Sequence, residues 1–229
     1  TASGGPFWNT PIEELRLVTP EQALNHPTWK MGKRISLDSA TLMNKGFEVI
    51  EACWLFGFAP SEVDVVVHPQ STVHAMVEYV DGSVLAQLST TDMRMPIQYA
   101  LTYPDRGPGP VPRLRWEQAR SWEFFPPDSD KFPLLRIAYE AQQAGGSAPC
   151  TLNAADEVAV ESFLKGEISF MEIARIVEET LSRMGSTTVE SVADVLEKDR
   201  QSRIVAQSLI QGESRSVAVT GAGSPLTAA

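Results

Sequence analysis

A segment rich in proline and glycine is the feature that most constrains how this chain can fold. Residues 104–112 read Pro-Asp-Arg-Gly-Pro-Gly-Pro-Val-Pro. Proline lacks the backbone N–H that helices and central strands need, and glycine weakens both kinds of element. No regular element is therefore expected to cross this segment. The chain is predicted to divide here, with residues 106–132 as a linker between two domains.

The part before the linker has the patterns of a mixed domain. Runs rich in β-branched or alternating residues predict strands at 63–68, 73–80 and 83–89. Asp81 and Gly82 join the last two runs, and Asp-Gly is a strong hairpin signal. Helical patterns lie at residues 38–56 and 95–101. Residues 1–105 are therefore predicted to form an α/β (α+β) domain with a sheet of at least three strands.

The part after the linker has the patterns of helices only. Apolar residues recur at helical spacing in four runs, at residues 134–144, 153–164, 169–184 and 189–209. Short connections between them predict an all-α four-helix bundle over residues 133–211. The remaining residues, 212–229, are rich in serine, glycine and alanine and are predicted to be disordered.

Charge and cysteine content narrow the classes of partner and the compartment. The net charge of −10 argues against a general affinity for nucleic acid or for an anionic membrane surface. Cys53 and Cys150 are the only cysteines, which do not form a disulfide framework, so a reducing, cytoplasmic compartment is expected. No membrane-spanning run or signal peptide is apparent. The chain does not begin with methionine, which indicates that it comes from inside a longer protein.

The helix predicted at 38–56 is the most informative element. Asp38 and Ser39 are suitable N-cap residues, and Gly57 can end the helix. A buried stripe is predicted from the spacing of Met43, Phe47, Ile50 and Trp54. Gly46 weakens a helix interior, so its presence indicates a close approach of a ligand or of another part of the backbone.

A second face of the same helix carries polar chemistry. Asn44, Glu48 and Glu51 follow one another at i, i+4 and i+7, and Lys45 lies one turn before Glu48. Donors and an ammonium at one end suit a phosphate, with Ser39 adding a hydroxyl, while the carboxylates suit a divalent metal. The alternative is that Lys45 and Glu48 form an ordinary surface ion pair and that Ser39 is only a cap.

Two loops could complete such a site. The Ser-Gly-Gly sequence at residues 3–5 can direct backbone N–H groups and the Ser3 hydroxyl at an anion; the alternative is a plain turn. His26, Trp29 and Met31 lie on a loop bounded by Pro27 and Gly32, as expected of a lid over a ligand. The alternative is that the last two of these side chains pack on the core.

The remaining titratable residues are assigned to the scaffold. His68 and His74 stand near strand ends, where a lone histidine is more often structural than catalytic. No histidine and cysteine cluster has zinc spacing. Glu157 and Glu161 are interpreted as part of a solvated helix face.

These residues fall in segments that, in this order from residue 1 to about residue 210, closely resemble the 1-deoxy-D-xylulose 5-phosphate reductoisomerase family. The segments are Ser3-Gly-Gly-Pro-Phe, His26-Pro-x-Trp29-x-Met31-Gly, Asp38-Ser39-Ala-Thr-x-Met43-Asn44-Lys45-Gly-x-Glu48-x-Ile-Glu51-Ala, His68-Pro-Gln-Ser71 with His74, Asp81-Gly-Ser and Leu152-Asn-Ala-Ala-x-Glu157. The block from 38 to 51 is the most specific of them.

The resemblance implies an activity. The family converts 1-deoxy-D-xylulose 5-phosphate to 2-C-methyl-D-erythritol 4-phosphate in the non-mevalonate isoprenoid pathway. Mn²⁺ or Mg²⁺ chelates the substrate oxygens, the carbon skeleton rearranges by retro-aldol cleavage and aldol recombination, and NADPH reduces the branched aldehyde. Members are homodimers that pair through the sheet of the central domain, and their other partner is the small phosphosugar substrate.

The resemblance also implies residue roles. The substrate phosphate and neighbouring hydroxyls would be held by Ser3, Ser39, Asn44 and Lys45. Glu48 would bind the metal, with Glu51 beside it. The lid over the substrate would include His26, Trp29 and Met31. By the same resemblance, Glu48, Glu51 and His26 are the catalytic residues.

The chain departs from the family in two respects. It has no Gly-x-Gly-x-x-Gly after a strand, as an NADPH-binding Rossmann domain would require. It also lacks the upstream Asp-Ser-Glu segment that carries the family's other metal carboxylates. We therefore predict a portion of a reductoisomerase that alone binds no NADPH and is inactive. The alternatives are a different metal-dependent sugar-phosphate isomerase or aldolase, and a non-catalytic dimeric module that binds a phosphosugar.

Overall fold

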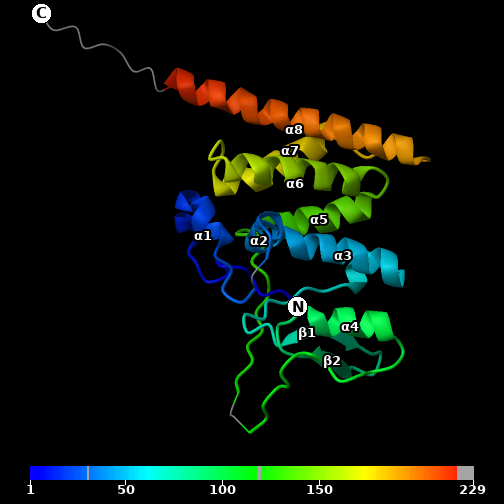
Figure 1. The fold of residues 1–229 in the computed structure, drawn as a ribbon. Helices are drawn as coiled ribbons and strands as arrows, with labels where there is room; N and C mark the ends of the chain where they lie inside the picture. The colour runs from blue at the N-terminus through cyan, green and yellow to red at the C-terminus, as the bar shows by residue number, and fades with distance from the viewer. Residues whose placement is uncertain (30, 118–119, 221–229) are drawn as a thin grey trace, which may run out of the picture.

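The computed structural model describes residues 1–29, 31–117 and 120–220, with side chains described up to residue 212. These residues form a mostly helical structure with a small two-stranded sheet (Figure 1). The α-helices are α1 Pro20–Leu24, α2 Lys33–Ala40, α3 Met43–Phe56, α4 Arg94–Thr102, α5 Pro133–Ala144, α6 Ala148–Leu164, α7 Phe170–Met184 and α8 Val192–Thr220. The strands are β1 Val73–Glu78 and β2 Val84–Leu88, and two short 3₁₀ helices are η1 Ile12–Leu17 and η2 Pro60–Glu62.

The predicted hairpin is confirmed. β1 and β2 pair antiparallel, and Gly82 adopts a φ of 81° in the turn between them, which favours glycine. The prediction of a third strand at residues 63–68 is wrong for the described residues. Of these, Val67 forms only single bridges, to Ala2 and to Phe125. Pro69 follows and lacks the N–H that would extend a ladder.

The start of the central helix differs from the prediction. Asp38 and Ser39 do not cap it, because they lie in the last turns of the preceding helix α2. Leu42 then takes a left-handed conformation, with φ of 62°, and α3 begins at the next residue. The side chain of Leu42 is buried, so packing compensates for a conformation that costs an ordinary residue about 1–2 kcal/mol. Sequence pattern alone does not reveal such a break.

The buried face of α3 is rotated from the predicted one. Met43 is buried, but Trp54 is 76% exposed, so the predicted stripe is wrong at its far end. The face that points inward instead includes Gly46, whose hypothetical Cβ would lie 2.6 Å from the Cβ of Ala138 in α5. The close approach predicted at this glycine is therefore confirmed, with α5 as the neighbour. Gly57 ends the helix with a φ of 71°, as predicted.

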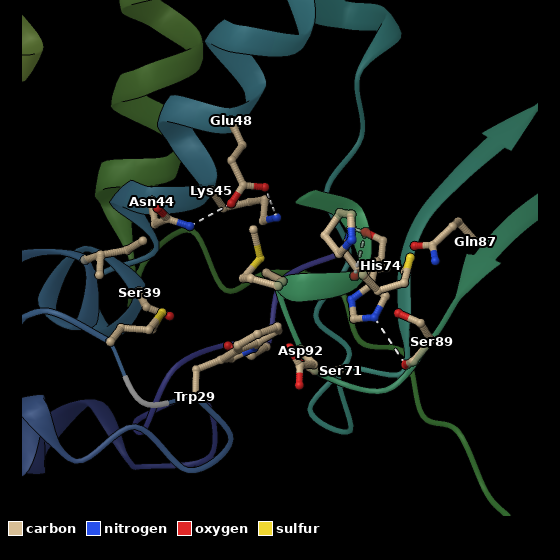
Figure 2. Close-up of a pocket in the computed structure, with 18 of the residues that line it drawn as sticks. Trp29, Ser39, Asn44, Lys45, Glu48, Ser71, His74, Gln87, Ser89 and Asp92 are labelled. Carbon is tan, nitrogen blue, oxygen red and sulfur yellow. Dashed lines mark hydrogen bonds and ion pairs between the residues drawn. The ribbon is translucent and has the colours of Figure 1, made fainter. Parts of the chain in front are cut away.

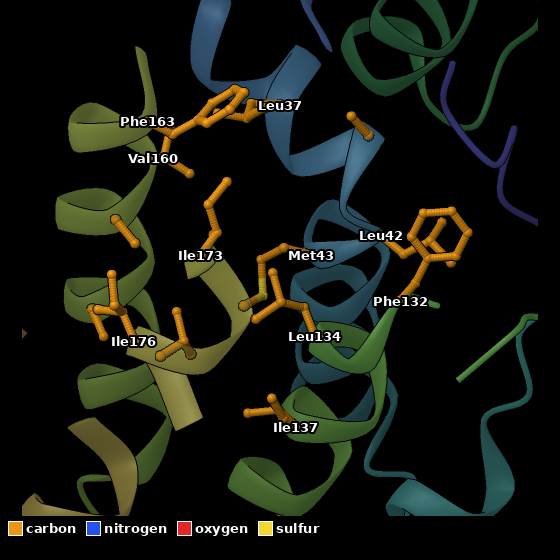
Figure 3. Close-up of a cluster of buried hydrophobic side chains, with 14 of the residues drawn as sticks. Leu37, Leu42, Met43, Phe132, Leu134, Ile137, Val160, Phe163, Ile173 and Ile176 are labelled. Atoms are coloured by element: carbon orange, nitrogen blue, oxygen red, sulfur yellow. The ribbon is translucent and has the colours of Figure 1, made fainter. Parts of the chain in front are cut away.

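The second half of the chain supplies most of the core. Figure 3 shows apolar side chains of α2, α3, α5, α6 and α7 meeting between the helices. The largest of the labelled, fully buried side chains are Leu37, Met43, Leu134, Ile137, Phe163, Ile173 and Ile176. α8 packs on α6 and α7 at the outer side of the stack (Figure 1). This arrangement holds α2 and α3 against α6 and α5, respectively.

Two boundaries in this half differ from the prediction. α6 begins at Ala148, earlier than predicted, with Pro149 in its first turn, a position that proline tolerates. α8 continues to Thr220, and residues 221–229 lie outside the described part, so the disorder predicted for residues 212–229 stays a prediction. The predicted solvated face is correct for Glu161, which is exposed, but wrong for Glu157, which bonds with Arg34 and Arg203.

Candidate active site

A cleft of about 1250 Å³ lies between the α2–α3 corner on one side and the hairpin on the other (Figure 2). Residues of α4 complete its lining. Every predicted site residue except His26 lines it, namely Ser3, Trp29, Met31, Ser39, Asn44, Lys45, Glu48 and Glu51. These residues come from the N-terminal loop, the loop before α2, the end of α2 and the first turns of α3. The fold thus brings together side chains that are far apart in the sequence.

The first two turns of α3 hold a compact polar group. The Nδ2 atom of Asn44 donates to Oε1 of Glu48 at 2.7 Å, and the ammonium of Lys45 pairs with the other carboxylate oxygen. The ion pair considered in the sequence analysis therefore exists, but it faces the cleft (Figure 2). Because 45% of the Glu48 side chain remains exposed, its carboxylate is accessible to a cation. The ammonium of Lys45 also lines the cleft, where an anion could bind to it.

His26 lies just behind the cleft and orients Ser3. Its Nδ1 atom accepts hydrogen bonds from the backbone N–H groups of Thr28 and Trp29, at 3.1 and 3.0 Å. The proton of the neutral ring is therefore on Nε2, which donates to Oγ of Ser3 at 3.0 Å. Burial lowers the pKa of His26, so the neutral form prevails at pH 7. One ring thus connects the loop that carries Trp29 to the serine–glycine loop.

The serine–glycine loop packs directly on the end of α2. Gly5 has a φ of 65°, and a Cβ atom there would lie 2.6 Å from the carbonyl oxygen of Ser39. The N–H of Gly5 also donates to Oγ of Ser3 at 3.3 Å. The positions of Ser3 and Ser39 relative to each other are therefore fixed by a contact between two backbone segments. Only glycine at position 5 permits this contact.

The opposite wall contains residues that sequence reasoning missed. The part of the cleft formed by the hairpin and α4 is lined by Ser71, His74, Gln87, Ser89, Asp92, Met93, Met95, Tyr99, Tyr103 and Arg106. Nε2 of His74 donates to the carbonyl oxygen of Ser89 at 3.2 Å, and burial lowers the pKa of this histidine. No local pattern marks these residues, because they reach the cleft only through strand pairing and the packing of α4.

The two histidines assigned to the scaffold have different surroundings. His68 is completely buried and stacks on Phe124 with ring centroids 4.6 Å apart. Its Nδ1 bonds with the carbonyl oxygen of Glu123 at 2.9 Å, and its Nε2 accepts from the N–H of Thr72 at 3.1 Å. These contacts fit the structural role assigned to it, whereas His74 lies in the wall of the cleft.

Backbone strain is concentrated at the cleft. Among the described residues, the non-glycine residues with positive φ are Leu42, at 62°, and Ser71, at 46°. Both line the cleft. Strained conformations of this kind persist where the surrounding structure holds them, and they are common at binding sites. The strain therefore supports a functional interpretation of this cavity.

The donor set suits a hard cation only in part. Glu48 and Glu51 offer carboxylate oxygens, which Mg²⁺ and Mn²⁺ prefer. However, no three histidine, cysteine, aspartate or glutamate residues of the described ranges lie together as a metal site. A cation bound at Glu48 would need further oxygen ligands from a substrate, from water or from another polypeptide segment.

These observations define a mostly helical protein with a small two-stranded sheet and a cleft lined by serine hydroxyls, an ammonium group and carboxylates. The chain belongs to the 1-deoxy-D-xylulose 5-phosphate reductoisomerase family, because residues 88–205 match the family model described as the DXP reductoisomerase C-terminal domain. Residues 1–56 match a second model, the 1-deoxy-D-xylulose 5-phosphate reductoisomerase C-terminal domain. The resemblance seen in the sequence is therefore confirmed.

Individual relatives agree with this assignment. The chain is 71% identical to 1-deoxy-D-xylulose 5-phosphate reductoisomerase of Solibacter usitatus over 91% of its length, and 55% identical to that of Pseudomonas aeruginosa over 90%. It covers only 53% and 52% of those proteins, respectively. The chain thus spans about half the length of the curated relatives it matches.

Solved structures show the same arrangement. The enzyme from Zymomonas mobilis in complex with NADPH superposes with a TM-score of 0.85 at 45% identity, covering 91% of this chain and 54% of that one. A reductoisomerase in complex with NADPH, fosmidomycin and magnesium gives a TM-score of 0.87 at 43% identity, over 92% of this chain and 54% of that one. The fold prediction is confirmed at the level of a helical structure with a small sheet.

Within residues 1–29, 31–117 and 120–220, no helix has both the length and the apolar character needed to cross a bilayer.

Proposed function

We propose that this chain is part of an enzyme that converts 1-deoxy-D-xylulose 5-phosphate to 2-C-methyl-D-erythritol 4-phosphate. The observation that carries the proposal is the convergence of Ser3, Ser39, Lys45 and Glu48 on one cleft in a chain of this family. The substrate would be a phosphosugar, and the cofactors would be NADPH and either Mg²⁺ or Mn²⁺. Solved relatives that hold NADPH, magnesium and fosmidomycin support this choice.

The phosphate end of the substrate would lie between the serine–glycine loop and the corner of α2 and α3. Lys45 would supply positive charge, and Asn44 and the hydroxyls of Ser3 and Ser39 would supply hydrogen-bond donors. Donors and charge of this kind bind phosphate more tightly than neutral contacts do. Glu48 neutralises Lys45, so the ammonium would exchange this partner for the phosphate when the substrate binds.

The reacting end of the substrate would lie beside Glu48 and Glu51. We assign Glu48 as a metal ligand and Glu51 as the carboxylate next to the metal. A bound divalent cation would stabilise negative charge on the substrate oxygens. The further metal ligands and most of the NADPH site would lie in polypeptide outside this chain, since the relatives are about twice as long. The chain alone is therefore expected to be inactive. In the complete enzyme, NADPH would supply the hydride.

The loop before α2 would close over the substrate. Trp29 and Met31 line the cleft, and His26 bonds with Ser3 at its edge. Closing such a loop excludes water from a reactive intermediate. We assign His26 to the catalytic group because its Nε2–H orients Ser3, which would contact the substrate. The lid would carry His26, Trp29 and Met31.

We also propose how the chain is organised and where it works. Residues 1–105 would form the central catalytic domain and residues 133–211 an all-α four-helix bundle, joined by the linker 106–132. A second copy would pair through the sheet, since Val77, Val80 and Leu85 expose apolar side chains there. A dimeric mass in light scattering would support this, and a monomer at micromolar concentration would contradict it. The free thiols and the net charge of −10 suit a cytoplasmic enzyme without nucleic-acid or membrane partners.

The test of the proposed function is an assay of NADPH oxidation. The protein at its natural length is mixed with 1-deoxy-D-xylulose 5-phosphate, NADPH and Mn²⁺, and 2-C-methyl-D-erythritol 4-phosphate is identified as the product. Turnover that needs the metal supports the proposal. Binding of the phosphosugar without turnover would favour the non-catalytic module, and turnover of another sugar phosphate without NADPH would favour a different isomerase.

A further inference from the structure

A network of charged side chains joins α2 to α6 and α8 behind the cleft. Arg34 of α2 donates from Nη2 to Oδ1 of Asn153 at 2.8 Å and pairs through Nη1 with the carboxylate of Glu157. Guanidinium nitrogens of the same side chain lie 3.6 Å from carboxylate oxygens of Asp38 and of Asp156. One arginine thus connects the short helix α2 to the long helix α6.

Glu157 extends the network to the C-terminal helix. Its second carboxylate oxygen pairs with Arg203 of α8, which is itself held by Asp199 at 2.7 Å. Nearby, the hydroxyl of Ser202 donates to that of Thr151 at 3.0 Å. Glu157 is therefore shared by two guanidinium groups from helices that begin more than 150 residues apart.

The network ends on the helix that forms the wall of the cleft. Arg34 and Asp38 occupy one face of α2 at i and i+4, while Ile35 and Ser39 occupy the adjacent face and line the cleft. Any rotation or shift of α2 would therefore move Ser39. The backbone of Gly5 packs on the carbonyl of Ser39, so the serine–glycine loop would move with it.

The composition of the network argues against a role limited to stability. Nε of Arg34, one oxygen of Asp38 and both oxygens of Asp156 are buried without a hydrogen-bond partner. A buried ionic group with unmet hydrogen bonds stabilises a fold no better than apolar residues of the same size. What it does provide is a defined orientation between the elements that it joins.

We propose that Glu157 is a positioning residue for the phosphate site. Through its ion pairs with Arg34 and Arg203, Glu157 holds α2, and with it Ser39, in place. This inference rests on the proposed function, since Ser39 is taken to contact the phosphosugar. Glu157 itself does not line the cleft. Its effect is exerted on binding of the phosphate rather than on the reacting atoms, so it should be visible in the Michaelis constant.

The test compares variants of the protein at its natural length in the NADPH oxidation assay. E157Q and R203Q each weaken the link between α8 and α2. The controls are E161Q, on the same helix and paired with Lys165, and R200Q, on α8 and paired with Glu197. We expect E157Q and R203Q to raise KM for 1-deoxy-D-xylulose 5-phosphate about tenfold, as for other coupled networks. Inorganic phosphate should inhibit them correspondingly less.

The kcat value should change little, because the phosphate is held equally in the ground state and the transition state. R203K, which keeps the charge, should recover most of the affinity. A rise in KM confined to E157Q and R203Q supports the proposal. Unchanged KM in an active enzyme, or equal rises in the two controls, would overturn it. Failure of the unmodified protein to turn over the substrate would contradict the proposed function instead.

The network also predicts a pH dependence of stability. Burial raises the pKa of Asp38 from 3.8 to about 6 and raises that of Asp156 well above its ordinary range. The groups that face this pair are Arg34, Glu157 and Asn153, with Arg203 and Asp199 behind them. As two carboxylates the pair has no donor between them, so one proton shared by both would join one buried oxygen of Asp38 to one of Asp156.

A carboxyl group with a raised pKa in the folded state contributes stability below its ordinary pKa. That stability is lost as the pH rises through the raised value. The free energy of unfolding is therefore expected to fall between about pH 4 and pH 7, and D156N should flatten this fall because the amide donates to Asp38 at every pH. The free energy of unfolding is measured by urea denaturation. The control is D130N, which replaces an exposed aspartate. An unchanged pH profile in D156N would contradict the shared proton.

Discussion

Replacing Glu48 by glutamine is expected to lower kcat about a thousandfold or more, while leaving the protein folded. The carboxylate is the cleft group best placed to bind a cation, because it is accessible and held by Asn44 at 2.7 Å. Glutamine has nearly the same shape and can still accept that hydrogen bond, but a neutral amide is a much weaker ligand for Mg²⁺ or Mn²⁺. Losing several kcal/mol of charge stabilisation corresponds to about 10³-fold in rate.

Measurement of kcat over a range of Mn²⁺ concentrations would test this expectation. The control is E197Q, which removes a charge from another glutamate paired with a cation three residues later but on the exposed surface of α8. That variant should keep full activity. If E48Q retained normal kcat at the same metal concentration, Glu48 would not be a metal ligand, and the pair that it forms with Lys45 would be the ordinary ion pair considered from the sequence.

The features of the fold that depend on local sequence were predictable. The hairpin at Asp81 and Gly82 and the end of α3 at Gly57 both need a left-handed backbone that glycine adopts without strain. The corner between α2 and α3 was not predictable. It depends on Leu42, which ordinarily avoids positive φ and is held there by burial of its side chain. A pattern of residue types therefore predicts where a chain can turn easily, but not where packing forces it to turn.

The same distinction applies to the site. Asn44, Lys45 and Glu48 lie within two turns of one helix, so their spacing alone placed them on one face. His74 and Tyr99 reach the cleft through strand pairing and the packing of α4, for which a single sequence carries no signal. Glu157 was assigned to solvent for the same reason, since its partner Arg34 is 123 residues away.

Replacing Gly5 by alanine is expected to disrupt the phosphate end of the site. The residue has a φ of 65°, and its Cβ would lie 2.6 Å from the carbonyl oxygen of Ser39 and 2.8 Å from the Cα of Ala40. Both neighbours are backbone atoms at the end of a packed helix, so they cannot move as a flexible side chain would. Strain and overlap together should cost about 2–4 kcal/mol of stability. Separation of Ser3 from Ser39 should raise the KM for the phosphosugar at least tenfold.

The variant G57A separates the two causes. Gly57 has a similar φ of 71°, but a Cβ there would meet nothing within 4 Å, so alanine at this position introduces the backbone strain without the overlap. It should cost only about 1–2 kcal/mol, measured by urea denaturation, and leave KM unchanged. If G5A behaved like G57A in both measurements, the contact between the serine–glycine loop and α2 would not set the site. A much larger loss in G5A, seen in KM as well as in stability, would show that substrate affinity depends on the close approach of two backbones.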